Sequence, residues 1–134
     1  MTLELKATPE EVMRAVEALR QFGVEHCLAE ADIFGVTLAL EECASNVVNH
    51  ALKRDSTKNF QVTINQAGSE LVVEVTDEGV EFDPQLAAKE ASDDGPVGGW
   101  GLQLVRRYTD DLRYSRAGNK NVWRLSRRLG RDKS

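Results

Sequence analysis

The stretch EECASNVVNH, residues 41–50, lies inside a long pattern of helical spacing. The pattern covers residues 33–52, which we expect to form one helix. One face of this helix is apolar and consists of Val36, Leu40, Ala44, Val47 and Ala51. The polar residues of the stretch stand out against this apolar background, so their spacing is the first indication of a site.

Glu42, Asn46 and His50 follow one another at intervals of four residues and form one slowly drifting stripe along the helix. Asn49 lies beside this stripe, whereas Glu41 points about 140° away from Asn46. A carboxylate can accept a proton from a nucleophile, and an amide oxygen is a hard ligand that suits Mg²⁺. The alternative is a solvated helix face, although such faces carry Glu, Lys and Gln more often than Asn and His.

Two further elements are predicted before this helix. Residues 2–6 alternate apolar and polar side chains, which indicates a strand. Thr8 is the expected N-cap of a helix that has Pro9 in its first turn and Glu11 at the capping-box position. Apolar residues at helical spacing extend this helix to about Phe22.

The second half of the chain predicts mainly strands. In order, we expect two strands joined through residues 67–69, an irregular stretch over 83–99, a helix over 101–108, and a hairpin of 112–115 and 122–127 around 118–119. Helices come mostly first and antiparallel strands later. This order favours an α+β fold with helices stacked on one face of the sheet, and it disfavours a doubly wound parallel sheet.

Length and charge limit the function classes. The chain has 134 residues, so we expect one domain over residues 1–134. Lys and Arg number 17 and Asp and Glu number 22, which sets the formal charge at −5. An acidic balance disfavours general nucleic-acid binding, which depends on basic side chains that neutralise phosphates. We interpret the terminal basic run of Arg127, Arg128, Arg131 and Lys133 as a solvated tail.

Neither the N-terminus nor the cysteines indicate an exported or membrane protein. The chain begins without a basic region followed by an apolar run, and no apolar stretch is long enough to cross a bilayer. Cys27 and Cys43 lack a metal-type spacing, and we expect both to be small buried side chains in helices. The expected location is therefore the cytoplasm, with no membrane partner.

A second candidate segment runs from Glu74 to Pro84. Here a strand is expected to end at Asp77, and the chain turns at Gly79. A carboxylate at a strand end can accept a hydrogen bond from an exocyclic amine such as that of adenine, and a glycine allows the backbone to approach a flat ring closely. The alternative is an ordinary Asp-x-Gly turn, which is common.

The third segment is Gly98-Gly99-Trp100-Gly101-Leu102, a glycine-rich loop that leads into a helix. Backbone N–H groups at such a helix start can meet phosphate. The segment is not a Walker A loop, because no Gly-Lys-Ser/Thr follows, and it is not a dinucleotide fingerprint, because that motif needs a preceding strand in a βαβ unit. A flexible linker before a helix is the alternative.

The order and spacing of the three segments are more specific than any one of them. Glu-x-x-x-Asn-x-x-x-His, then Asp-x-Gly-x-x-Phe-Asp-Pro, then Gly-Gly-x-Gly-Leu resembles the N box and the first two glycine boxes of the GHKL ATPase superfamily. Within it, the chain is most similar to the bacterial anti-sigma factor serine kinases. The Phe82-Asp83-Pro84 sequence and the Leu102-x-Leu104-Val105 helix start are typical of that branch.

The resemblance implies a two-layer α/β sandwich whose mixed sheet is mostly antiparallel, with ATP between the helices and the loop at 83–99. It implies that Glu42 is the general base, that Asn46 is the Mg²⁺ ligand and that Asp77 binds adenine. Gly79 would lie behind the adenine base, and Gly99, Gly101 and Leu102 would form the hinge and the phosphate-facing end of the ATP lid. The implied cofactor-binding set is Asn46, Asn49, His50, Asp77, Gly79, Phe82, Gly98, Gly99, Gly101 and Leu102.

The resemblance also implies a function. The chain would be an ATP-dependent protein-serine kinase and anti-sigma factor that phosphorylates a serine of a small anti-sigma antagonist and sequesters a sigma factor. The implied partners are this antagonist, the sigma factor and a second copy in a homodimer, without direct nucleic-acid binding. The alternative is an ATP-binding regulatory module that sequesters a partner without significant kinase turnover; the presence of Glu42 favours the enzyme.

The chain departs from the superfamily at one place. The Gly-Thr of the third glycine box is replaced by Gly118-Asn119-Lys120-Asn121, so Asn121 is not assigned an adenine contact. Histidine kinases share the same boxes but carry a phosphoacceptor histidine on an upstream dimerisation helix. About forty residues precede the N box here, too few for that helical hairpin in addition to the first helix of the domain.

Overall fold

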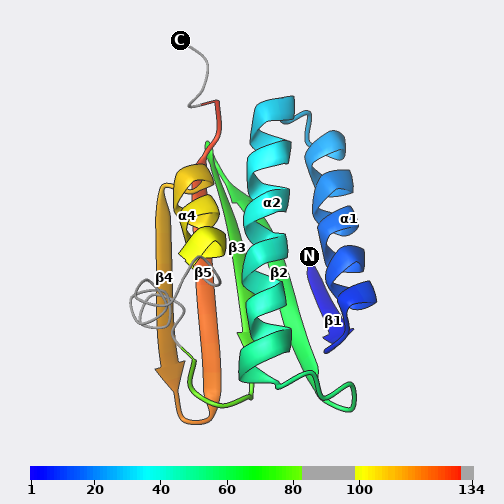
Figure 1. The fold of residues 1–134 in the computed structure, drawn as a ribbon. Coiled ribbons are helices and arrows are strands. Elements are labelled where there is room, and N and C mark those ends of the chain that lie inside the picture. The colour runs from blue at the N-terminus through cyan, green and yellow to red at the C-terminus, as the bar shows by residue number, and fades with distance from the viewer. Residues whose placement is uncertain (83–98, 131–134) are drawn as a thin grey trace.

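The computed structural model describes residues 1–82 and 99–130, without the side chains of residues 99–102. Its elements, in chain order, are β1 (Thr2–Lys6), α1 (Pro9–Glu25), α2 (Glu30–Asn46), the π-helix η1 (Val47–Ala51), β2 (Asn59–Ala67), β3 (Glu70–Asp77), α4 (Gly99–Tyr108), β4 (Asp111–Ala117) and β5 (Lys120–Arg128). These elements form a helical layer and a sheet layer, and all three α-helices cover the same face of the sheet (Figure 1).

The sheet has the strand order β1-β2-β3-β5-β4. Each pair of neighbouring strands is antiparallel. The predicted α+β class and the two-layer arrangement are therefore confirmed, whereas the expected mixed sheet is antiparallel throughout the described residues. Because β5 lies between β3 and β4, the end of β3 is brought beside the start of β5.

The hydrophobic core lies between the sheet and α2, which occupies the middle of the helical layer (Figure 1). Apolar side chains alternate along the strands, and Val62, Ile64 and Val75 are fully buried on the helix-facing side. Leu40 and Ala44 of α2 are equally buried against them. Complete burial of each Val, Leu or Ile side chain contributes about 1.5–3 kcal/mol, so this contact fixes α2 on the sheet.

The first helix follows the sequence prediction closely. The Thr8 hydroxyl accepts a hydrogen bond from the Glu11 backbone N–H at 3.2 Å, while the Glu11 carboxylate accepts one from the Lys6 backbone N–H. The helix extends three residues beyond Phe22. The prediction that Cys27 is buried in a helix is wrong: it is exposed in the turn after α1, where its backbone has a φ of 57°.

The long helix predicted over 33–52 differs from the structure at both ends. It begins at Glu30, and its α-helical part ends at Asn46, after which the chain continues as η1. The Leu52 backbone N–H donates to the Val47 carbonyl at 2.8 Å, five residues back. A π-helix has a wider turn than an α-helix and is frequent at functional sites, so the polar stripe of the sequence changes direction after Asn46.

The prediction that the terminal basic run is a solvated tail is wrong for Arg127. This residue lies in β5, its side chain is 1% exposed, and its Nε donates to the Asp32 carboxylate at 2.9 Å. Arg127 Nη1 also donates to the Tyr108 carbonyl at the end of α4. The pair therefore joins β5, α2 and α4 at the end of the sheet opposite to Asp77; Arg131 and Lys133 lie outside the described residues.

Candidate functional site

Asp77 is the last residue of β3, and its side chain faces the helical layer with only 2% exposure. Its Oδ1 accepts hydrogen bonds from the Gly79 backbone N–H at 2.7 Å and from Asn121 Nδ2 at 2.8 Å. Its Oδ2 is buried and has no hydrogen-bond partner among the described residues. A buried carboxylate oxygen without a partner costs free energy because it has lost its hydration. A hydrogen-bond donor from a ligand would therefore be favourable at this atom.

Several effects of opposite sign act on the pKa of Asp77. Burial raises the pKa of this carboxyl group above its ordinary value, while the hydrogen bonds from Asn121 and Gly79 and the charge of Arg116 act to lower it. Burial raises the pKa of the Cys43 thiol, and the Asp77 charge acts in the same direction. Cys43 is therefore a neutral neighbour of Asp77 on α2.

Gly79 lies against η1. A Cβ atom at this position would overlap the carbonyl group of Ala51 and would also approach Asp77 Oδ1 to 2.9 Å. The same Ala51 carbonyl accepts the Val80 backbone N–H at 3.0 Å. The close approach of the two backbones therefore requires glycine, as the Asp-x-Gly segment predicts, and it joins the end of β3 to η1.

Asn121 is a site residue that the sequence analysis left unassigned. It is fully buried, and it pairs with Asp77 in the register of β3 and β5 and with Arg116 in the register of β4 and β5. Its amide contacts Asp77, Arg116 and Tyr114. The hairpin predicted around 118–119 is a sequence signal that places Arg116 opposite Asn121. The contact between Asn121 and Asp77, however, depends on the pairing of β3 with β5.

Glu42 and Asn46 lie on α2, and both are half-buried. Burial, and after it the neighbouring charge of Glu41, raises the pKa of the Glu42 carboxyl group. A carboxylate that is partly withdrawn from water and holds its proton more tightly is suited to general-base work near neutral pH. The structure thus places a carboxylate and an amide oxygen on the same helix as Cys43, the thiol whose pKa the Asp77 charge raises.

The polar stripe does not continue unchanged into η1. The His50 ring is stacked on Phe82, with the ring centroids 4.7 Å apart, so two residues of the predicted nucleotide-binding set lie together. Asn49 is exposed, and its Oδ1 accepts a hydrogen bond from Arg54 Nε at 3.2 Å. The structure thus gives Asn49 a partner outside the predicted set.

The glycine-rich segment is described only in part. Gly98 lies outside the described residues, while Gly99, Gly101 and Leu102 form the first turn of α4. The bright yellow start of α4 points toward the end of the molecule where α2 ends, and its darker end lies near the start of α2 (Figure 1). The N-terminus of α4, which is the positive end of the helix dipole, thus faces the same end of the molecule as Asp77.

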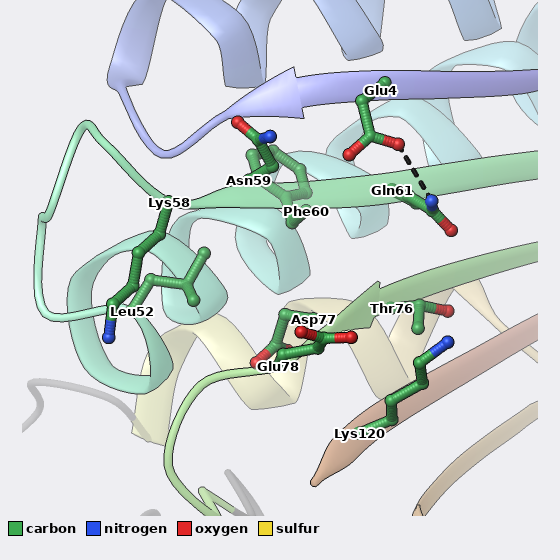
Figure 2. Close-up of a pocket in the computed structure, with 10 residues that line it drawn as sticks. All are labelled: Glu4, Leu52, Lys58, Asn59, Phe60, Gln61, Thr76, Asp77, Glu78 and Lys120. Atoms are coloured by element: carbon green, nitrogen blue, oxygen red, sulfur yellow. Dashed lines mark hydrogen bonds between the residues drawn. The ribbon is translucent and has the colours of Figure 1, made fainter.

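A cavity of about 360 Å³ also adjoins Asp77 (Figure 2). Glu4, Gln61 and Thr76 line it from neighbouring positions of β1, β2 and β3, on the sheet face opposite to the helices. Among the predicted site residues that the structure describes, Asp77 alone lines this cavity. It therefore lies beside the predicted nucleotide site and belongs mainly to the open face of the sheet.

These features together define a site for a ligand with a hydrogen-bond donor at one end and negative charge at the other. The buried Asp77 Oδ2, which has no partner in the described part of the chain, and the glycine backbone beside it fit an aminopurine base. The half-buried Glu42 and Asn46, on the helix beside Asp77, fit the reacting end and its cation. The residues present therefore fit ATP and Mg²⁺, and the class that this fold and site define is a nucleotide-binding domain.

Comparison of the sequence with known families identifies the class directly. A sequence model of the family described as the histidine kinase-like ATPase domain matches residues 5–127. The chain belongs to this family. The resemblance to the GHKL ATPase superfamily drawn from the three segments is therefore confirmed.

Two relatives of known name are similar over most of the chain. Serine/threonine-protein kinase BtrW of Bordetella bronchiseptica is 28% identical over 124 residues, which cover 90% of this chain and 87% of the relative. Serine-protein kinase RsbW of Listeria innocua is 27% identical over 121 residues, which cover 84% and 77%. The predicted enzyme class, a protein serine/threonine kinase, agrees with both names.

Solved structures share the fold. The structure of the RsbU and RsbW domains of a Mycobacterium tuberculosis protein superposes with a TM-score of 0.70 at 22% identity, covering 96% of this chain and 32% of that one. The SiaB-SiaC complex from Pseudomonas aeruginosa gives a TM-score of 0.65 at 14% identity, covering 96% and 89%. Among the residues that the structure describes, no helix is long and apolar enough to span a membrane.

Proposed function

We propose that this chain is an ATP-dependent protein-serine kinase that phosphorylates a small regulatory protein, with one domain over residues 1–134. The observation that carries the proposal is the buried Oδ2 of Asp77, which has no hydrogen-bond partner among the described residues. In this proposal it accepts a hydrogen bond from the exocyclic amine of adenine. Gly79 allows the base to lie against the backbone where β3 meets η1. The names of the two relatives, BtrW and RsbW, support the kinase activity.

The other residues take the following roles in this proposal. Asn46 would hold Mg²⁺ through its side-chain oxygen, and the ion would neutralise phosphate charge. Glu42 accepts the proton of the attacking serine hydroxyl, in the way that carboxylates orient the acceptor in phosphoryl transfer. His50 and Phe82 close the side of the site as a stacked pair. The start of α4, at Gly99, Gly101 and Leu102 after Gly98, faces the phosphates.

The partners are part of the same proposal. The acceptor is an anti-sigma antagonist that carries the serine, and the unmodified antagonist competes with a sigma factor for the kinase. The protein acts as a homodimer in the cytoplasm.

The second candidate function is a binding module that holds ATP and sequesters its partner with little turnover. Glu42, with its raised pKa, favours the enzyme, because nucleotide binding alone needs no base.

A transfer assay separates the two candidates. Labelled ATP, Mg²⁺ and a co-encoded antagonist protein are incubated with the wild type, with Glu42→Gln and with Glu41→Gln as the matched control. Glu42→Gln should cut transfer by roughly 10²–10⁴-fold, the usual contribution of a general base, while ATP affinity stays nearly intact. Glu41→Gln should retain transfer. Absence of ATP binding to the wild type would overturn the nucleotide site, and ATP binding without transfer would favour the binding module.

A further inference from the structure

Asn121 makes a complete set of hydrogen bonds inside the site. Its Nδ2 donates to Asp77 Oδ1 at 2.8 Å and to the Val80 carbonyl at 2.9 Å. Its Oδ1 accepts from Arg116 Nη1 at 2.8 Å and from the Tyr114 hydroxyl. The side chain is fully buried, so water does not replace any of these partners.

The chemistry of two partners fixes which way the amide points. Arg116 can only donate hydrogen bonds, and the Val80 carbonyl can only accept them. A flipped amide would bring its NH₂ group against the Arg116 guanidinium and its oxygen against the Val80 carbonyl. Asn121 therefore always presents a donor to Asp77, and Arg116 holds it in that orientation.

This orientation decides what Asp77 offers to a ligand. Oδ1 already accepts two hydrogen bonds, from Asn121 and from Gly79. A proton bound by Asp77 would therefore reside on Oδ2, the oxygen without a partner among the described residues. The ionised carboxylate offers an acceptor at Oδ2, whereas the protonated acid offers a donor at the same place.

The groups around Asp77 push its protonation in opposite directions. Burial raises its pKa, and the bond from Asn121 is the first of the effects that lower it, followed by the Gly79 N–H and the Arg116 charge. The titratable or charged groups near it are Cys43 of α2 and Arg116 of β4. Tyr114 of β4 is bonded to Asn121, and Lys58, Glu78 and Lys120 line the neighbouring cavity on the open face of the sheet. Without the hydrogen bond from Asn121, burial would raise the pKa of Asp77 further.

We infer that Asn121, held in one orientation by Arg116, is a specificity-determining residue that makes the site select a 6-aminopurine nucleotide over a 6-oxopurine nucleotide. The inference rests on the proposed nucleotide site. An ionised Asp77 accepts a hydrogen bond from the 6-amino group but faces the lone pairs of a 6-oxo group. A protonated Asp77 donates to the 6-oxo group, so removal of Asn121 should relax the choice of base.

The test compares ATP with inosine triphosphate, which carries an oxo group at the 6-position and a proton on N1. Their dissociation constants are measured by calorimetry with Mg²⁺, from mildly acidic to mildly alkaline pH, for the wild type, Asn121→Leu and Arg116→Met. The wild type should prefer ATP by about tenfold or more, as expected for one hydrogen bond to a charged group. Asn121→Leu should lose most of this preference at mildly acidic pH and recover part of it as the pH rises, because Asp77 then ionises.

Arg116→Met provides a second route if Asn121→Leu does not fold, because Arg116 is only half-buried. It should shift the pH profile of the preference in the same direction by a smaller factor. Arg113→Met, which removes an exposed arginine from the same strand, should leave the preference unchanged. A folded Asn121→Leu or Arg116→Met with the wild-type preference at every pH would overturn the inference; a wild type that binds no ATP would instead overturn the proposed nucleotide site.

Discussion

Gly79 lies so close to Ala51 that a Cβ atom added to Gly79 would overlap the Ala51 carbonyl group. That carbonyl belongs to η1 and is held by the Val80 backbone N–H. Gly79→Ala must therefore push η1 away from the turn that follows Asp77. The substitution should destabilise the fold by roughly 1–3 kcal/mol, as in other overpacked sites, and it should also weaken ATP binding. Urea unfolding and calorimetry measure the two effects.

Gly68→Ala is the control for this prediction. Gly68 has a φ of 61° and no atom within 4 Å of an added Cβ, so the substitution costs backbone strain of about 1 kcal/mol without moving the site. ATP affinity should stay unchanged in Gly68→Ala. If Gly79→Ala binds ATP as tightly as Gly68→Ala, the contact between η1 and the turn has no role in the site.

Asn46→Ala tests the proposed metal ligand. Asn46 is half-buried at the end of α2, where the helix changes to η1. Its loss should weaken ATP binding in Mg²⁺ but change little in EDTA, because the amide oxygen would act only through the cation. Ser45→Ala, a half-buried neighbour, should change neither condition. Equal losses for Asn46→Ala with and without Mg²⁺ would mean that this side chain supports the helix alone.

The rate of phosphoryl transfer should depend on pH through Glu42. Burial and the Glu41 charge raise the pKa of Glu42, and the group must be ionised to accept a proton. Transfer should therefore rise with pH, and its acid limb should lie at higher pH than the ordinary value of a glutamate predicts. Glu41→Gln removes the second cause and should move the acid limb to lower pH. An acid limb that stays in place would show that Glu41 does not influence the base.

Local patterns predicted the fold well, because helical spacing and strand alternation are properties of adjacent residues. The change from α2 to η1 after Asn46 was not predicted, since the sequence period alone does not distinguish a π-helical turn from an α-helical one. It matters for the site, because it separates Asn49 and its partner Arg54 from the stripe of Glu42 and Asn46.

Long-range contacts account for the other differences. Asn121 was left unassigned because its contact with Asp77 arises from the pairing of β3 with β5, strands that are not consecutive in the chain. Arg127 was assigned to a solvated tail because its neighbours in sequence are also basic. Its alternation with Trp123 and Leu125 along β5, both buried, is the local signal that points its side chain inward.

The buried pair of Arg127 and Asp32 should be a large contributor to the free energy of unfolding. The Asp32 carboxylate accepts Arg127 Nε and the Gly130 backbone N–H, both at 2.9 Å. Arg127→Met leaves this buried carboxylate without its cation and should cost about 3–5 kcal/mol, measured by urea unfolding. Asp32→Asn combined with Arg127→Met removes the charge while it keeps an acceptor for Gly130, so the double variant should be more stable than Arg127→Met alone.

Arg124→Met is the matched control on the same strand. Arg124 lies 3.9 Å from the Glu70 carboxylate, and the two side chains are 41% and 49% exposed. Water screens such a pair, so its loss should cost less than about 1 kcal/mol. Arg127 also donates to the Tyr108 carbonyl at the end of α4, so Arg127→Met should loosen α4 as well. Hydrogen exchange at the amides of α4 should therefore accelerate in Arg127→Met but not in Arg124→Met. Similar unfolding free energies for the two single variants would contradict a structural role for the buried pair.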